Sequence, residues 1–309
     1  MLILGKYSSI ILKQGFSMRL FFIMLVLCSL NAISQEKIEP VFKFNQPGIL
    51  SENSGMIFWD GLLWQHNDGG GDAAIYALDT LSNSITRRVS IKNGFNVDWE
   101  DIAQDEQFIY IGDFGNNNNG GRPKFTIYKV SKADIINTTG NISVNAEIIH
   151  YTYEDQPAVP VIGASNATNF DCEAMIALDD KIYLFTKQWK GNKTVLYELN
   201  NSTNTQIAKL KDSLVVDGLI TGADIFKDKK RIVLTGYTKT GMRFLYILHD
   251  FMGYDFFKGS KQKIVLFGLA QTESVAFINE GYIFLGSEAL MGIKPRLEML
   301  SIKKYFLKN

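Results

Sequence analysis

The chain has 309 residues, of which 46% are hydrophobic and 21% are charged, a balance typical of a globular protein with a well-filled core. Its 32 basic and 32 acidic residues cancel, so no global field attracts nucleic acid or an anionic lipid surface. No local basic run stands out either, and we therefore expect no nucleic-acid partner.

The first segment has the pattern of a secretory signal peptide. From Met18 the chain has a basic residue, Arg19, an apolar stretch over residues 20–27, and small residues ending in an A-x-S site at Ser34. We predict a signal peptide over residues 1–34, with translation starting at Met18. The apolar stretch is shorter than the roughly 20 residues that a membrane-spanning helix needs. We therefore expect no membrane span after signal removal, and a secreted or periplasmic protein.

Cysteine usage agrees with this interpretation. Cleavage after Ser34 leaves Cys172 as the one cysteine of the mature chain, so an intramolecular disulfide is excluded. An alternative is a lipoprotein anchor on Cys28, but Leu27 stands where such signals place a small residue.

A strand–turn–strand pattern recurs along the rest of the chain. Each copy begins at an apolar anchor, and successive anchors are 46, 73, 50 and 50 residues apart. The anchors are Met56, Ile102, Met175, Ile225 and Val275. A second apolar strand follows each anchor, at residues 61–64, 107–110, 181–184, 231–234 and 281–284. Third strands are predicted at 74–78, 126–130, 195–199, 244–248 and 296–300, and more variable fourth strands at 85–91, 147–153, 205–210 and 263–267.

Four short strands per unit, rich in Ile, Val, Tyr and Phe, are typical of a propeller blade. We predict an all-β fold, a single β-propeller over residues 35–309 with five visible repeats. The 73-residue spacing leaves room for another blade, so five and six blades both stay open. Residues 40–44 precede the first repeat and the last repeat lacks a fourth strand. Pairing the two would close the ring without an open edge.

One face of such a propeller should carry many polar side chains, because the starts of the first strands and the ends of the second strands meet there. Several carboxylates at one channel mouth repel each other unless a cation is present. Oxygen ligands suit Ca²⁺ or Mg²⁺, and the scarcity of His and Cys disfavours Zn²⁺. The alternative is that each acid caps a local turn. The predicted metal ligands are Glu52, Asp68, Asp98, Glu100, Asp113, Asp171, Glu173 and Glu273.

Other side chains on this face could contact a small-molecule or cell-envelope ligand. A Trp can stack on a ring, and basic residues can meet an anionic group. The predicted ligand-binding residues are His66, Asn67, Trp99, Arg122 and Lys187. No Gly-x-Ser-x-Gly nucleophile elbow is present.

Short motifs around the anchors resemble those of known exported propellers. The fragments at residues 52–56, 98–103, 171–175 and 272–276 are similar to the E-x-S-G-[LM] and D-x-E-[GSA]-[ILMV] signatures of the SdiA-regulated family and of the family described as the esterase-like activity of phytase. The likeness to the gluconolactonase group is looser. The resemblance implies a propeller, export and Ca²⁺. Ala223 stands where the fourth repeat would carry an acid, so a full lactonase metal set is not matched.

These observations favour an exported binding module with a Ca-type cation and a ligand site at the channel mouth, acting as a monomer. The alternative is a metal-dependent hydrolase of phosphate esters or lactones. In that case the cation would activate water, with Glu100 or Glu173 as general base. A third interpretation is a protein-interaction scaffold that uses the propeller rim.

Overall fold

The computed structural model describes residues 37–226, 228–289 and 292–306. The chain divides into two units, Met1–Glu36 and Lys37–Asn309, and the described residues all belong to the second. The predicted signal peptide over residues 1–34 lies outside the described residues. Among these residues, no helix has the length and apolar character needed to cross a membrane.

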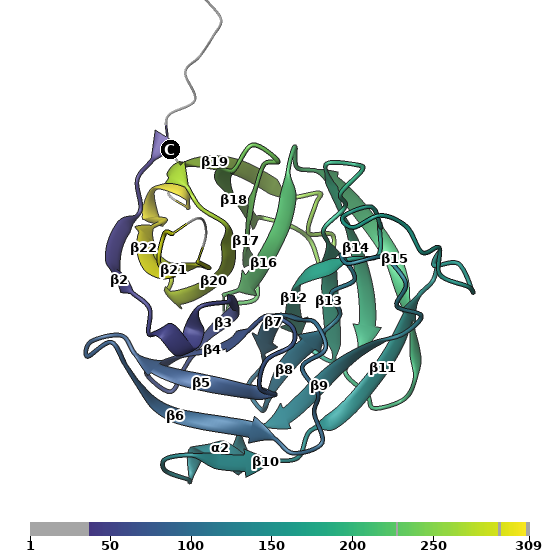
Figure 1. Cartoon of the computed structure of the whole chain (residues 1–309). Coiled ribbons are helices and arrows are strands. Elements are labelled where there is room, and N and C mark those ends of the chain that lie inside the picture. The colour runs from purple at the N-terminus through teal and green to yellow at the C-terminus, as the bar shows by residue number, and fades with distance from the viewer. Residues whose placement is uncertain (1–36, 227, 290–291, 307–309) are drawn as a thin grey trace, which may run out of the picture. The chain divides into compact units, whose positions relative to one another are not determined.

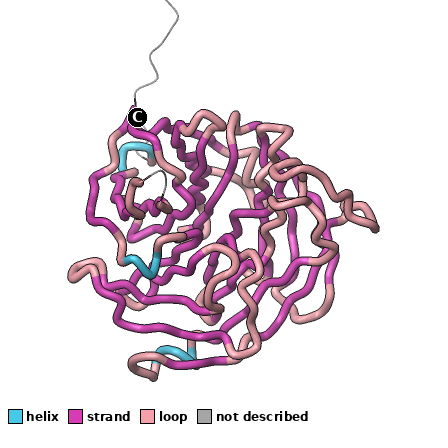
Figure 2. Tube along the Cα trace, viewed as in Figure 1, coloured by secondary structure: helices cyan, strands magenta, loops and turns pink. Residues whose placement is uncertain are grey.

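Strands dominate the described part of the chain, and only short helical segments interrupt them (Figure 2). These segments are the 3-10 helices η1 (Gly48–Leu50) and η2 (Lys303–Tyr305) and the α-helix α2 (Ala133–Ile136). The predicted all-β fold is therefore confirmed.

The first repeat forms a five-stranded sheet with the order β10-β6-β5-β4-β3. Its strands are β3 (Asn53–Trp59), β4 (Leu62–Asn67), β5 (Ala74–Asp79), β6 (Ser84–Ile91) and β10 (Ile142–Val144). Strand β10 belongs to a later part of the chain and pairs in parallel with β6.

The second and third repeats share an eight-stranded sheet, in which β11 and β15 pair in parallel and join two antiparallel halves. One half contains β7 (Trp99–Gln104), β8 (Phe108–Asp113), β9 (Phe125–Ser131) and β11 (Glu147–Tyr153). The other contains β12 (Cys172–Leu178), β13 (Lys181–Thr186), β14 (Lys193–Asn200) and β15 (Gln206–Val215).

Two more sheets complete the described structure. One has the order β1-β19-β18-β17-β16 and contains β16 (Leu219–Ile225), β17 (Arg231–Tyr237), β18 (Met242–His249), β19 (Ser260–Leu269) and β1 (Lys37–Ile38). The other has the order β2-β22-β21-β20 and contains β20 (Thr272–Asn279), β21 (Tyr282–Ser287), β22 (Arg296–Ser301) and β2 (Val41–Asn45). Here the N-terminal strand β2 pairs with the last strand of the chain, β22.

The first strand of each repeat, namely β3, β7, β12, β16 and β20, lies near a common centre (Figure 1). Such a strand is covered on both faces, and all seven residues of β12 are buried. Apart from Glu173, the residues of β12 are Cys, Ala, Met, Ile and Leu. The outer strand β6 instead alternates between more and less exposed side chains, as expected of a strand with one face towards water.

The hydrophobic core lies between neighbouring sheets. One cluster joins Tyr110 of β8 to Leu184 of β13, and another joins Phe185 of β13 to Leu234 of β17. Repeated antiparallel sheets that pack face to face around a centre are the architecture of a β-propeller. The long spacing between the second and third anchors contains α2, β10, β11 and the segment 154–171.

A buried hydrogen bond connects the last repeat to the first. Ser274 of β20 donates from its hydroxyl to Oδ1 of Asn53 on β3, and both residues are fully buried. We expect Ser274→Ala to lower the free energy of unfolding by about 1–3 kcal/mol, because it leaves the Asn53 oxygen buried without that donor. Urea denaturation measures the loss as a shift in midpoint. The exposed Ser143→Ala is the matched control, and an equal effect of both substitutions would contradict the prediction.

Candidate functional site: an acidic channel mouth

Every repeat has a β-bulge at the start of its first strand. In four repeats the pairing with the second strand skips the residue two positions before the anchor. In the fourth repeat it skips Thr221, four positions before Ile225, so Thr221, and not Ala223 as predicted, is equivalent to the glutamates of the other repeats. The skipped residues are Ser54, Glu100, Glu173, Thr221 and Glu273. A bulge leaves its extra residue unpaired and re-aims the side chain. The repeated bulge therefore brings the three glutamates to the same end of the central strands.

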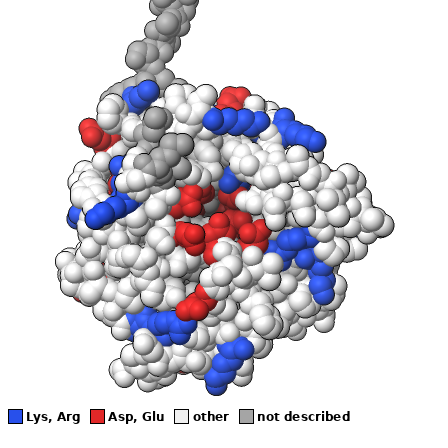
Figure 3. Space-filling view, viewed as in Figure 1, with Lys and Arg blue, Asp and Glu red and all other residues white. Residues whose placement is uncertain are grey.

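Acidic side chains gather in a hollow of this face (Figure 3). The ends of the second strands lie beside the bulges, since Trp99 pairs with Asp113 and Cys172 with Thr186. The predicted convergence of acids at one channel mouth is thus visible in the structure.

Two sets of three carboxylates are close enough to share a cation. The first triad is Asp68, Asp98 and Glu100, and the second triad is Glu100, Asp171 and Glu173. Within each triad the potential ligand oxygens lie within 4.8 Å of one another. Glu100 belongs to both triads and lies at the centre of the cluster.

Glu100 is buried, with 3% of its surface exposed, and its Oε1 has no hydrogen-bond partner. Its Oε2 has a weak contact with the hydroxyl of Ser54, at 3.5 Å. Gly115 allows the Glu100 and Asp98 carboxylates to approach its backbone, because a Cβ at that position would lie 2.1 Å from Glu100 Oε1 and 2.5 Å from Asp98 Oδ2. A buried carboxylate oxygen without a donor is costly, and a cation bound at this position would lower that cost.

The second triad already has donors. Lys187 Nζ lies 2.6 Å from Glu173 Oε2, and both side chains are buried. The indole of Trp189 donates to Asp171 Oδ2 at 2.8 Å, and the backbone N–H of Asn116 donates to Asp171 Oδ1 at 2.8 Å. The two triads therefore differ in how well their charges are compensated.

Burial and mutual repulsion make several of these carboxyl groups hard to ionise. Burial, followed by the charges of Asp68 and Asp171, raises the pKa of Asp98 to about 7. Burial and the charge of Glu273 raise the pKa of Glu288 to about 8. Burial, followed by the charge of Glu173, also raises the pKa of Glu100 well above its usual range. A divalent cation would relieve this repulsion.

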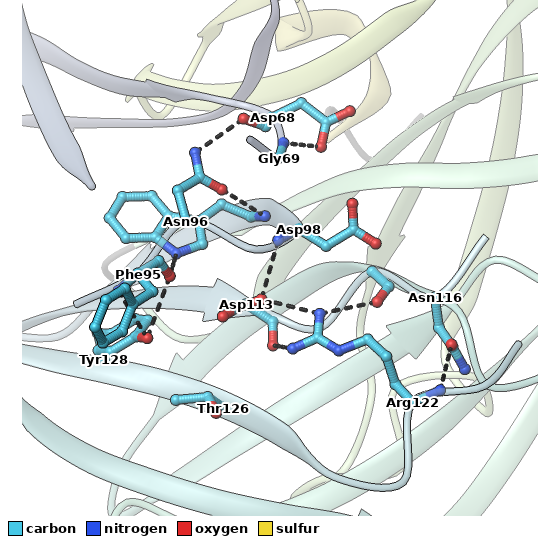
Figure 4. A network of polar contacts seen from close by, with 12 residues as sticks. Asp68, Gly69, Phe95, Asn96, Asp98, Asp113, Asn116, Arg122, Thr126 and Tyr128 are labelled. Atoms are coloured by element: carbon cyan, nitrogen blue, oxygen red, sulfur yellow. Dashed lines mark hydrogen bonds and ion pairs between the residues drawn. The ribbon is translucent and has the colours of Figure 1, made fainter. Parts of the chain in front are cut away.

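Five of the eight predicted metal ligands belong to the triads, and three lie outside them. Asp113 is held by Arg122, whose Nη1 lies 2.9 Å from Asp113 Oδ1 (Figure 4). Glu52 is exposed at the rim of the mouth. Glu273 is buried, and its Oε1 lies 3.4 Å from the amide nitrogen of Gln271.

Two of the predicted ligand-binding residues are fully buried, His66 and Trp99. Burial lowers the pKa of His66 to about 4, so its imidazole is neutral at pH 7. The Trp99 ring packs edge-on against His66, and its indole N–H donates to the carbonyl of Phe95. Trp99 therefore presents no open face on which a ligand could stack.

The other three predicted ligand-binding residues also have partners. Arg122 binds Asp113 and the carbonyl of Gly115, and Lys187 binds Glu173. The side-chain amide of Asn67 donates to the carbonyl of Ile49, while its Oδ1 has no partner. The repeat pattern also places Gly115 and Glu288 on this face, but neither was among the predicted ligands. The bulges were not predicted, although the acid that recurs two residues before three of the anchors could have indicated them.

A cavity of about 340 Å³ lies at the opposite ends of the same central strands. Its wall includes Phe58 at the end of β3, Gln104 at the end of β7 and Phe277 of β20. Neither triad borders it. The cavity wall carries charged residues of its own, namely Asp105, Glu106, Lys132, Asp179, Asp224 and Lys229.

Comparisons with known proteins give no family. No protein-family model matches the chain, and no curated protein matches it. The resemblance to the SdiA-regulated and phytase-esterase families is therefore not supported by a family match.

Several solved structures have a similar chain path. PQQ-bound aldose sugar dehydrogenase from Streptomyces coelicolor is 10% identical, with 85% of this chain and 97% of that chain covered and a TM-score of 0.44. Hydrazine synthase from Kuenenia stuttgartiensis is 12% identical, with 84% and 65% covered and a TM-score of 0.42. A protein of unknown function from Bacteroides thetaiotaomicron is 13% identical, with 85% and 74% covered and a TM-score of 0.39. This chain thus spans less than two thirds of the hydrazine synthase chain. The propeller assignment rests on the sheet order and packing of the chain itself.

Proposed function

We propose that the protein is an exported binding module that holds a Ca-type divalent cation in the first triad and binds a ligand over it. The observation that carries this proposal is the buried Glu100 Oε1, which has no hydrogen-bond partner and lies among other carboxylates. Gly115 supports it, because the missing side chain allows the Glu100 and Asp98 oxygens to come together at its backbone.

The donor set favours a hard cation. Both triads consist of Asp and Glu oxygens, which suit Ca²⁺ or Mg²⁺, whereas Zn²⁺ prefers His and Cys. Ca²⁺ takes six to eight oxygen ligands. Three carboxylates therefore leave coordination positions for water or for ligand oxygens at the mouth.

We infer a ring of five blades, closed by pairing of β2 with β22. In support, hydrogen bonds connect several neighbouring first strands. Ser54 of β3 donates to the carbonyl of Glu100 on β7, and the backbone N–H of Met175 on β12 donates to Asp101 of β7. Thr221 of β16 donates to the carbonyl of Thr272 on β20. The bond from Ser274 to Asn53 leads back to β3.

Export and a monomeric state belong to the same proposal. The support for export is the signal pattern that ends at Ser34. Mass spectrometry of the mature protein from the parent cell should give an N-terminus at Gln35, and size-exclusion chromatography with light scattering should give one chain per particle.

A binding function is favoured over hydrolysis because neither candidate general base is free to accept a proton. Glu173 is held by Lys187 at 2.6 Å, and Glu100 is required as a cation ligand. A general base must be free to reach the proton that it abstracts. Assays of phosphomonoesters and lactones with Ca²⁺ should therefore show no turnover, and turnover lost in Glu100→Gln would favour the hydrolase alternative.

Calorimetric titration with Ca²⁺ after chelation tests the cation site. We expect binding by the wild-type protein and an affinity about 100-fold lower in Glu100→Gln, because one charged ligand of three is lost (about 2.7 kcal/mol). Glu106→Gln is the control, since Glu106 is an exposed acid near the opposite cavity. Absence of Ca²⁺ binding by the wild-type protein would refute the proposal.

A further inference from the structure

The acidic mouth is divided into two halves that share one residue. The first and second triads have Glu100 in common and differ in their other members. Ca²⁺ binds oxygens at 2.3–2.6 Å, so oxygens more than about 5 Å apart cannot bind the same ion. The cluster therefore has the form of a two-cation site in which the Glu100 carboxylate would be the bridge.

The second triad already has a positively charged partner from the protein itself, the Lys187 ammonium. The Lys187 ammonium lies 2.6 Å from Glu173 Oε2. Its nitrogen also lies 5.0 Å from the ring centroid of Trp189 and 5.5 Å from that of Tyr237. With 5% of the side chain exposed, the ammonium is enclosed by two aromatic faces and a carboxylate.

The surroundings keep Lys187 charged. Its ammonium lies 2.6 Å from the Glu173 carboxylate, and both side chains are buried, so the two opposite charges compensate each other. Removing one member of a buried ion pair leaves an uncompensated charge. Lys187 is thus a fixed cation, which an incoming metal ion would have to displace at a high cost.

Among the described residues, no basic side chain forms an ion pair with Asp68, Asp98 or Glu100 of the first triad. The hydroxyl of Ser54 is 3.5 Å from Glu100 Oε2, and Glu100 Oε1 has no hydrogen-bond partner among the described residues. The Glu100 and Asp98 oxygens lie against the backbone of Gly115. Arg122, a basic side chain on this side, forms an ion pair with Asp113.

We propose, resting on the proposed function, that Lys187 replaces the second metal ion of a two-cation site. The mouth then binds one divalent cation, in the first triad, and the Lys187 ammonium is the permanent counter-ion of the second. Lys187 is a positioning residue that sets the stoichiometry of cation binding. Its removal should convert the mouth into a site for two ions bridged by Glu100.

Native mass spectrometry and calorimetry with Ca²⁺ test this. The wild-type protein should bind one ion in the mouth, and Lys187→Met should bind two. The double variant Lys187→Met/Glu173→Gln removes the ion pair without changing the net charge, so it should again bind one ion, with an affinity within about tenfold of the wild type. Asp98→Asn should lose the single ion of the wild-type protein.

The outcomes separate this inference from the function on which it rests. Two ions in the wild-type mouth, or one ion in a Lys187→Met variant whose circular dichroism is that of the wild type, would overturn the inference alone. If Lys187→Met does not fold, the double variant decides, and loss of its ion would overturn the inference. No ion in the wild-type protein would overturn the proposed function as well.

Discussion

Saturating Ca²⁺ should raise the melting temperature of the protein by about 5–10 °C at pH 8 and by much less at pH 5. A ligand at 100 times its Kd stabilises the folded state by about 2.7 kcal/mol, and each kcal/mol corresponds to about 2–4 °C in a domain of this size. The pH dependence follows from the carboxylates that the cation would neutralise.

The direction of that dependence is set by Asp98 and Glu288, whose pKa values in the folded state are raised to about 7 and about 8. An acid with a raised folded pKa favours folding most below its unfolded pKa, and this contribution is lost as the pH rises through the folded value. The cation-free protein should therefore lose stability between about pH 4 and pH 8. At pH 5 these groups are protonated, and little charge remains for Ca²⁺ to neutralise.

Differential scanning calorimetry at pH 5, 6, 7 and 8, with chelator and with Ca²⁺, measures both effects. Asp98→Asn should remove most of the Ca²⁺-dependent rise, because it removes a ligand and one of the repelling charges. A rise of equal size at pH 5 and pH 8 would show that the cation is held by groups other than these carboxylates.

Gly115→Ala should lower the affinity for Ca²⁺ by at least about 100-fold, or about 2.7 kcal/mol. The new methyl group would lie 2.1 Å from Glu100 Oε1 and 2.5 Å from Asp98 Oδ2, closer than non-bonded atoms can approach. The two carboxylates must then move, and the cation loses the arrangement of its ligands. Calorimetric titration measures the affinity, and circular dichroism verifies the fold.

Gly163→Ala is the matched control for this prediction. Gly163 is also a loop glycine, and its backbone N–H donates to the carbonyl of Asn119. A Cβ added there would have no atom within 4 Å, so Ca²⁺ affinity should stay at the wild-type value. Similar affinities in the two variants would contradict the placement of the cation beside Gly115.

The strands could be predicted from the sequence because each blade repeats the same pattern of buried apolar residues. The anchors Met56, Ile102 and Met175 are buried on the first strands, and the hairpins that follow them are present as predicted. Strands β1 and β10 were missed, because each is short and pairs in parallel with a strand distant in the chain. No local pattern identifies such a partner.

The acids of the triads could be predicted because the phase of the repeat places them at one end of the first strands. Their partners could not be predicted. Arg122 reaches Asp113 from a loop within the second repeat, and Trp189 reaches Asp171 across a hairpin. These contacts depend on the conformation of loops, and loop sequences carry no periodic pattern from which that conformation could be predicted.

The sequence by itself determined the all-β propeller and the end of the channel at which carboxylates meet, because both follow from a periodic pattern of local burial. Tertiary structure alone decided which of those carboxylates remain without a partner. Glu100 and Glu173 occupy equivalent bulges, yet Glu173 is paired with Lys187 while Glu100 Oε1 is buried without a donor. The difference arises from side chains that approach from neighbouring elements, and charge compensation in a buried site depends on distances that only the folded chain sets.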